Sequence, residues 1–154
     1  KKFRREESDV LTILFSLLPT AIPPEVRGLV LRTIATLVHV DNIHAQECGL
    51  YSDKYKVAGR VDCIAEYKGT LSIIDFKTST KEKKEEWCEN YFIQCSAYCE
   101  MYEELYGKAI DQIVILIVTE EGATQTFVKN KKDYLPLLKP AIEEFHKKFK
   151  GDER

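Results

Sequence analysis

The sequence predicts an α/β fold with a mixed central sheet flanked by helices. Its apolar positions recur at helical spacing near both ends and alternate as in strands near the middle. Two strand-like segments meet at a glycine-containing turn, and the later segment 112–119 is continuously apolar. The chain has 154 residues, of which 44% are hydrophobic, enough for one domain with a buried core. We expect a single domain over residues 1–154, with a helical part at 1–40 and the core at 41–150.

Two helices are expected before the sheet. Ser8 can cap an apolar helix that ends at Pro19, and Pro23-Pro24 opens a second helix that continues through Val38. The first helix is too short to cross a bilayer. Acidic residues beside it and the lack of a small-residue cleavage site argue against a secretory signal. We therefore expect no membrane association.

A strand and then a β-hairpin begin the sheet. Segments 56–67 and 71–78 are rich in β-branched and aromatic residues, and Lys68-Gly69-Thr70 lies between them. This pattern predicts an antiparallel pair joined by a tight turn.

Helical and strand patterns then alternate to the end of the chain. Residues 83–107 predict a long amphipathic helix, and segment 112–119 predicts a strand covered on both faces. Residues 124–129 predict a short returning strand, and 134–150 a final helix. The apolar stripe of the long helix consists of Cys88, Tyr91, Phe92, Cys95, Cys99, Tyr102 and Leu105.

The predicted hairpin carries two acids and a lysine that can meet. Side chains two apart on a strand share a face, so Asp75 and Lys77 point the same way. Counting back from the turn places Asp62 level with Asp75. Carboxylates that close repel each other unless a cation lies between them. Mg²⁺ prefers hard oxygen ligands and is the expected cofactor, and Mn²⁺ could replace it.

Such a site suits the cleavage of a phosphodiester bond. A bound metal ion would activate water and stabilise negative charge on the phosphate. Lys77 could orient the water or neutralise the developing charge, and the sequence leaves both roles open. The alternative interpretation is a surface hairpin with an ordinary Asp-Lys pair.

Three motifs in order resemble the RecB-like branch of the PD-(D/E)XK nuclease superfamily. They are Gly59-Arg60-Val61-Asp62, Asp75-Phe76-Lys77-Thr78 and Gln94-x-x-x-Tyr98. The wider stretch from residue 41 is similar to phage-type exonucleases related to the mitochondrial genome maintenance exonuclease, and the resemblance covers residues 41–149.

The resemblance implies a restriction-endonuclease-like core and a role for each motif. Asp62 and Asp75 would be metal ligands, the main-chain carbonyl of Phe76 would be a third ligand, and Lys77 would be the catalytic lysine. The motif of Gln94 and Tyr98 would support the site or bind DNA, although a core-edge tyrosine beside a solvated glutamine is the alternative for this pair. The residues so implied are Asp62, Asp75, Phe76, Lys77, Gln94 and Tyr98.

The expected activity is a metal-dependent deoxyribonuclease, most simply an exonuclease acting on single strands or free ends. An endonuclease or repair nuclease on the same core is one alternative. A catalytically silent DNA-binding domain is another, because Arg32 occupies the histidine position of the upstream Arg-Gly-x-x-x-His motif that this branch usually carries. Residues that could substitute for that histidine are Glu25, His39, His44 and Glu47.

Charge limits how the chain can bind DNA. The formal net charge of −2 argues against a bulk polycation, so contacts with DNA must be local. Two lysine clusters could supply them or could be ordinary solvated surface. These clusters are Lys81, Lys83 and Lys84, and Lys129, Lys131 and Lys132.

The five cysteines indicate a reducing compartment, because their number is odd and no secretory signal is recognised. We expect a cytoplasmic protein, with a phage-infected host cell or the mitochondrial matrix as alternatives. Cys88, Cys95 and Cys99 lie in the stripe of one predicted helix, so they are interpreted as buried structural residues. No iron-sulfur cluster is expected.

Overall fold

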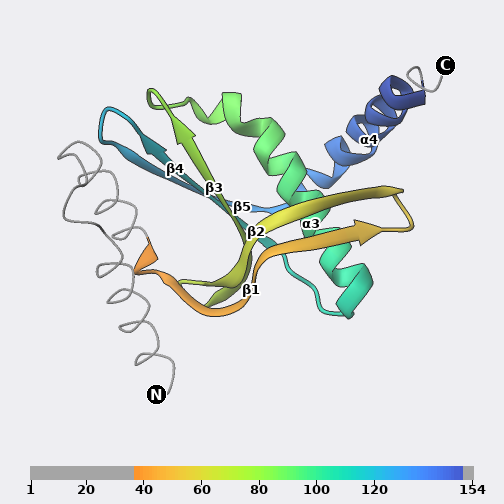
Figure 1. Ribbon diagram of the computed structural model, residues 1–154, viewed down its shortest axis with the longest axis horizontal. Helices are drawn as coiled ribbons and strands as arrows, with labels where there is room; N and C mark the ends of the chain where they lie inside the picture. The colour runs from red at the N-terminus through yellow and green to blue at the C-terminus, as the bar shows by residue number, and fades with distance from the viewer. Residues whose placement is uncertain (1–36, 151–154) are drawn as a thin grey trace.

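A five-stranded mixed sheet forms the centre of the fold, in the strand order β1-β2-β3-β4-β5 (Figure 1). The computed structural model describes residues 37–150. Strands β3 and β4 are parallel, and all other neighbouring strands are antiparallel. This arrangement confirms the predicted α/β class. The strands are β1 (Val40–Ser52), β2 (Val57–Tyr67), β3 (Thr70–Ser79), β4 (Gln112–Thr119) and β5 (Thr124–Asn130).

Helical segments follow β3 and β5. They are η1 (Glu85–Cys88), α3 (Glu89–Tyr106), η2 (Lys131–Asp133) and α4 (Leu135–Lys150). The helix predicted at 83–107 therefore begins later than expected, with a 3₁₀ turn before the α-helix. It ends at Gly107, whose φ of 69° suits glycine and whose N–H donates to the carbonyl of Glu103 at 2.8 Å. The two helices predicted before the sheet lie outside the described residues, apart from the end of the second at Leu37.

The β2–β3 turn has two residues rather than the three expected. Lys68 and Gly69 both have positive φ, at 49° and 83°, which is the requirement of a type I′ hairpin turn. Thr70 already pairs with Tyr67. Asp62 and Asp75 were predicted to lie level with each other, and this is confirmed, because the ladder runs back to Cys63 opposite Ile74 and leaves the two acids as the next two residues.

Both faces of the sheet are covered. Helix α3 packs against one face, where its apolar stripe forms a core with Ile73 and alternate residues of β4. Ile74 and Leu116 belong to a second cluster on the opposite face, against which Leu37 packs. In β4 every residue from Ile113 to Thr119 is buried, as predicted for a strand covered on both sides.

A buried ion network fixes the C-terminal half of α3. The side chain of Lys131, in η2, is only 7% exposed, and its Nζ lies 3.0 Å from a carboxylate oxygen of both Glu100 and Glu103 and 3.6 Å from Asp111. Burial acts to lower the pKa of Lys131, but its acidic partners outweigh that effect and raise it. The lysine therefore remains charged and ties α3 to η2.

Helix α4 is only partly packed. Leu138 is buried, whereas Phe145 and Phe149 are 48% and 57% exposed and lie against each other with ring centroids 4.4 Å apart. These two residues, in the second half of the helix, thus do not join the described core. Across residues 37–150, no helix combines the length and hydropathy needed to span a membrane.

Candidate active site

The candidate site lies where β2 and β3 separate (Figure 1). Their ladder stops at Cys63 and Ile74, so the following residues, Asp62 and Asp75, face each other at a fork. The N–H of Phe76 lies beyond the last main-chain pair with β2 and donates instead to the side-chain Oδ2 of Asp62 at 2.9 Å. The end of the ladder thus frees a main-chain group that orients one of the two predicted acids.

Asp75 and Lys77 form an ion pair on the face of β3 that α3 covers. Alternation along β3 places them with Ile73, which belongs to the α3 core. Nζ of Lys77 lies 3.0 Å from Oδ2 of Asp75, and the two side chains are 29% and 7% exposed. The structure therefore brings Asp62, Asp75 and Lys77 together.

The environment changes the protonation of both members of this pair. Burial first, and then the neighbouring carboxyl group of Asp62, raise the pKa of Asp75 from 3.8 to about 6, while Lys77 opposes the shift. Burial acts to lower the pKa of Lys77, but the hydrogen bond and charge of Asp75 and the charge of Asp62 outweigh it and raise the pKa. In the metal-free protein Lys77 is thus an ammonium at neutral pH.

The raised pKa of Asp75 predicts a pH-dependent cost to stability. A carboxyl whose pKa is higher in the folded than in the unfolded protein stabilises the fold below the unfolded value, here 3.8, and this contribution is lost as pH rises through about 6. We expect Asp75→Asn to melt at a higher temperature than the parent chain at pH 7.5 in EDTA, and the difference should vanish towards pH 4. Thermal scans over this range would measure it, with Glu121→Gln, an exposed acid in the β4–β5 turn, as control. A constant difference at all pH values would contradict it.

Gln94 and Tyr98 adjoin the site on α3. Gln94 is exposed, and its Nε2 donates to the hydroxyl of Tyr98 at 3.0 Å, whereas Tyr98 is only 5% exposed. The Tyr98 ring lies directly over Gly59 of β2: a Cβ at residue 59 would be 2.6 Å from Cε1 of that ring. Glycine at this position therefore lets α3 approach the strand that carries Asp62.

Tyr91 belongs to the same site, although the sequence indicated it only as part of an apolar stripe. Its ring centroid lies 4.9 Å from Nζ of Lys77, within cation–π range, and its hydroxyl accepts a hydrogen bond from Nζ of Lys83 at 2.9 Å. Tyr91 precedes Gln94 by three residues and Tyr98 by seven, which places all three on one helical face. That spacing could have identified it.

Comparison with known proteins settles the family. The family model described as the PD-(D/E)XK nuclease superfamily matches residues 15–152. The chain belongs to the PD-(D/E)XK nuclease superfamily. The resemblance of its motifs to this superfamily is thereby confirmed.

The chain is also similar to two known proteins. It is 40% identical over 47 residues to the mitochondrial genome maintenance exonuclease 1 of Mus musculus, a match that covers 30% of this chain and 14% of that protein. Its fold is similar to the crystal structure of a "Putative exonuclease" from Eubacterium rectale, with a TM-score of 0.50 and 11% identity over 77% of this chain and 51% of the other. The structural likeness shows a shared fold, and the chain spans only part of either protein.

Members of the PD-(D/E)XK superfamily generally use divalent metal ions, and the two acids here fit one. Oδ2 of Asp75 is buried and faces the Lys77 ammonium at 3.0 Å, and no other donor bonds to it within the described part of the chain. A bound cation would satisfy such an oxygen. Mg²⁺ is commonly held by one or two carboxylates plus water, so Asp62 and Asp75 are a sufficient protein ligand set.

A third acidic or histidine ligand does not join them among residues 37–150, where no group of three His, Cys, Asp or Glu side chains could hold a metal ion. Glu47 is instead paired with Arg60 at 2.8 Å, and the His39 ring packs edge-on against Tyr67. His44 is exposed to solvent. Glu25 and Arg32 lie outside the described residues.

Four of the five cysteines are buried, and Cys48 is partly exposed. Cys88, Cys95 and Cys99 are free thiols buried under α3, as predicted for structural residues. Burial raises the pKa of Cys99 to about 12 and that of Cys63, on the opposite face, to about 11. These thiols are therefore protonated and unreactive at neutral pH.

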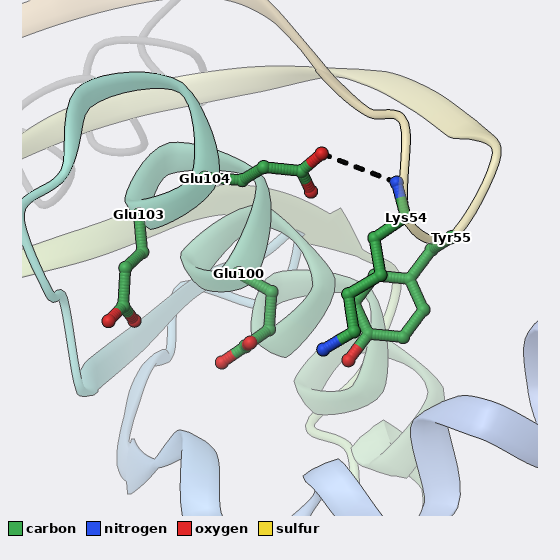
Figure 2. A pocket seen from close by; sticks show the side chains of 5 residues that line it. All are labelled: Lys54, Tyr55, Glu100, Glu103 and Glu104. Atoms are coloured by element: carbon green, nitrogen blue, oxygen red, sulfur yellow. Dashed lines mark hydrogen bonds between the residues drawn. The ribbon is translucent and has the colours of Figure 1, made fainter.

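A separate hollow beside α3 is unsuited to a nuclease substrate. Its volume is about 310 Å³. Figure 2 shows the residues that line it, which are Lys54, Tyr55, Glu100, Glu103 and Glu104. Its three glutamates would repel phosphate groups. Glu104 instead accepts hydrogen bonds from the N–H groups of Asp53 and Lys54, at 2.8 and 3.3 Å, which holds the β1–β2 turn against the helix.

Proposed function

We propose that this chain is a metal-dependent deoxyribonuclease, and specifically an exonuclease that hydrolyses phosphodiester bonds at DNA ends. The observation that carries the proposal is the meeting of Asp62, Asp75 and Lys77 at the fork between β2 and β3. This site places two acids of the kind that hold Mg²⁺ beside a fixed ammonium, in a chain of a nuclease superfamily.

The acids would hold the metal ion, and the fork supplies a further oxygen. The N–H of Phe76 points towards Asp62, and in an extended strand the N–H and C=O of one residue point to the same side. The carbonyl of Phe76 is thus directed into the fork, which supports its proposed role as a ligand. When bound, Mg²⁺ or Mn²⁺ would lower the pKa of a bound water and polarise the phosphate.

Lys77 would act as a positive charge rather than as a base. Its raised pKa in the metal-free protein and its contacts with Asp75 and the Tyr91 ring hold the ammonium in place. A fixed charge at that position would stabilise the negative charge that develops on the phosphate.

The motif of Gln94 and Tyr98 would mainly stabilise the structure around the two acids. The ring of Tyr98 is buried against Gly59, so it would hold β2 and α3 together, while the exposed amide of Gln94 is the part of the pair that could contact DNA. The free, buried thiols are compatible with a reducing, cytoplasmic setting.

The test is to incubate the chain with end-labelled linear single-stranded DNA and with closed single-stranded circles, in Mg²⁺ and in EDTA. We expect digestion of the linear strand in Mg²⁺ only, with the circles intact. Cleavage of the circles would indicate an endonuclease or repair nuclease instead. DNA that is bound but uncleaved in both Mg²⁺ and Mn²⁺ would indicate a catalytically silent domain.

A further inference from the structure

Lys83 is a cation placed next to the candidate site without an acidic partner. Its side chain is half-buried, its Nζ donates to the Tyr91 hydroxyl at 2.9 Å, and it lies 5.2 Å from the Tyr91 ring centroid. No carboxylate pairs with it within residues 37–150, whereas Lys77, Lys129 and Lys131 all have acidic partners. An uncompensated, partly buried ammonium is suited to an anionic ligand.

The main chain of Lys83 is held in place by β5. The side chain of Gln125 accepts a hydrogen bond from the Lys83 N–H at 2.8 Å and donates one to the Lys83 carbonyl at 2.9 Å. These two bonds anchor the loop that leaves β3. A ligand that bound Lys83 would therefore find the residue already positioned, which reduces the entropic cost of binding.

Tyr91 connects this cation to Lys77. Its ring centroid lies 4.9 Å from Nζ of Lys77 and 5.2 Å from that of Lys83. Lys83 thus lies on the other side of Tyr91 from the Asp75–Lys77 ion pair, near the N-terminus of α3. A phosphate next to the reacting one could lie within its reach.

An exposed indole ring lies in η1, directly before the N-terminus of α3. Trp87 is 61% exposed, and Nζ of Lys84 lies 5.4 Å from its ring. It lies in η1, four residues after Lys83 and four residues before Tyr91. Exposed aromatic rings beside cations are stacking platforms for bases, and stacking of this kind needs a base that is not already covered by its neighbours in a duplex.

Acidic residues limit the electrostatic contribution here. Glu82, Glu86 and Glu89 are exposed in the same segment, and Glu85 is paired with Lys129. Because the positive and negative charges nearly balance, binding would depend on a few well-placed contacts rather than on a broad positive field. A weak dependence on salt is therefore expected.

We propose that Lys83, Tyr91 and Trp87 form a binding site for an unpaired DNA strand beside the reacting phosphate. Lys83 and the Tyr91 hydroxyl hold one backbone phosphate, and Trp87 stacks on one base. The inference rests on the proposed function, since it concerns the substrate of the same site. It also identifies single-stranded DNA as the form that the site accepts.

The chain contains one tryptophan, so indole fluorescence excited at wavelengths that tyrosine does not absorb reports on Trp87 alone. In EDTA, where the DNA should stay intact, we expect oligo(dT) to quench this fluorescence saturably, and a blunt duplex of equal length to leave it nearly unchanged. Anisotropy of a labelled oligonucleotide would follow binding independently. Trp87→Ala should weaken binding about tenfold or more, whereas Trp87→Phe should retain most of it. Tyr106→Ala, at the other end of α3, is the control for an exposed aromatic residue.

Lys83 is tested by salt dependence. For single strands the slope of log K against log salt changes by about 0.7 for each phosphate contact. We expect Lys83→Gln to flatten the slope by about that amount, and Lys139→Gln, an exposed lysine on α4, to leave it unchanged. Circular dichroism would show that each variant is folded.

Binding without quenching, equal quenching by the duplex, or the same slope for both lysine variants would overturn this inference. Absence of any binding would overturn it as well. The proposed function is judged separately by cleavage in Mg²⁺. Cleavage with normal kinetics in Trp87→Ala and Lys83→Gln would support the nuclease assignment and contradict the proposed strand-binding site. Quenching by oligo(dT) without cleavage in Mg²⁺ would support the binding site and contradict the nuclease assignment.

Discussion

Asp75→Asn should lower DNA cleavage by at least about a hundredfold, the scale seen when one group that stabilises charge in a transition state is removed. The substitution keeps the size of the side chain but removes the charge that a metal ion would need and that pairs with Lys77. Since burial disfavours the charged form of Asp75, the variant should remain folded. Initial rates of digestion of end-labelled DNA in saturating Mg²⁺ would measure the loss.

Lys77→Met should cause a loss of similar size, because it removes the ammonium while keeping an unbranched side chain of similar length. Glu121→Gln and Lys139→Gln are matched controls that each remove one exposed charge of the same sign elsewhere. Full activity of folded Asp75→Asn or Lys77→Met would exclude that residue from the reaction.

Gly59→Ala should destabilise the fold by about 1–3 kcal/mol, the usual cost of overpacking a well-packed site. The added Cβ would lie 2.6 Å from Cε1 of the buried Tyr98 ring, so β2 and α3 would have to separate. Because β2 also carries Asp62, cleavage should fall as well. Urea unfolding and the digestion assay would measure the two effects.

Gly49→Ala is the matched control, because nothing lies within 4 Å of a Cβ built at that position in β1. A double-mutant cycle tests the cause directly. In a Tyr98→Ala background, the step from Gly59 to alanine should cost little, since the clashing ring is gone. An equal cost in both backgrounds would assign the effect to the backbone instead.

The hairpin and its acids could be predicted because they depend on local rules. Alternation along β3 fixed the common face of Asp75 and Lys77, and the position of Gly69 in the turn placed Asp62 opposite Asp75. The register counted from a tight turn allows little variation, because a slip of one residue would turn every side chain to the other face.

The rest of the site depends on how distant segments pack. The reason for Gly59 appears only when α3 lies across β2, and the position of Lys83 depends on Gln125, which lies 42 residues later on β5. Tyr91 was interpreted as a core position because its spacing is that of the apolar stripe. Local patterns do not indicate such contacts. The 3₁₀ start of the long helix also escaped prediction, since its residues share the period of the helix that follows.

Helix α3 contacts Lys77 and Gly59 at the candidate site and is anchored to η2 through Lys131. Tyr91 lies near one end, against Lys77, and Tyr98 lies near the middle, over Gly59. Glu100 and Glu103 anchor the other half through Lys131. At 1.5 Å per residue α3 is about 27 Å long. Loss of the contacts that anchor its C-terminal half would therefore let the helix tilt and would displace Tyr91 at the other end from Lys77. Substitutions should accordingly be tolerated less well along α3 than along α4, whose second half is only partly packed.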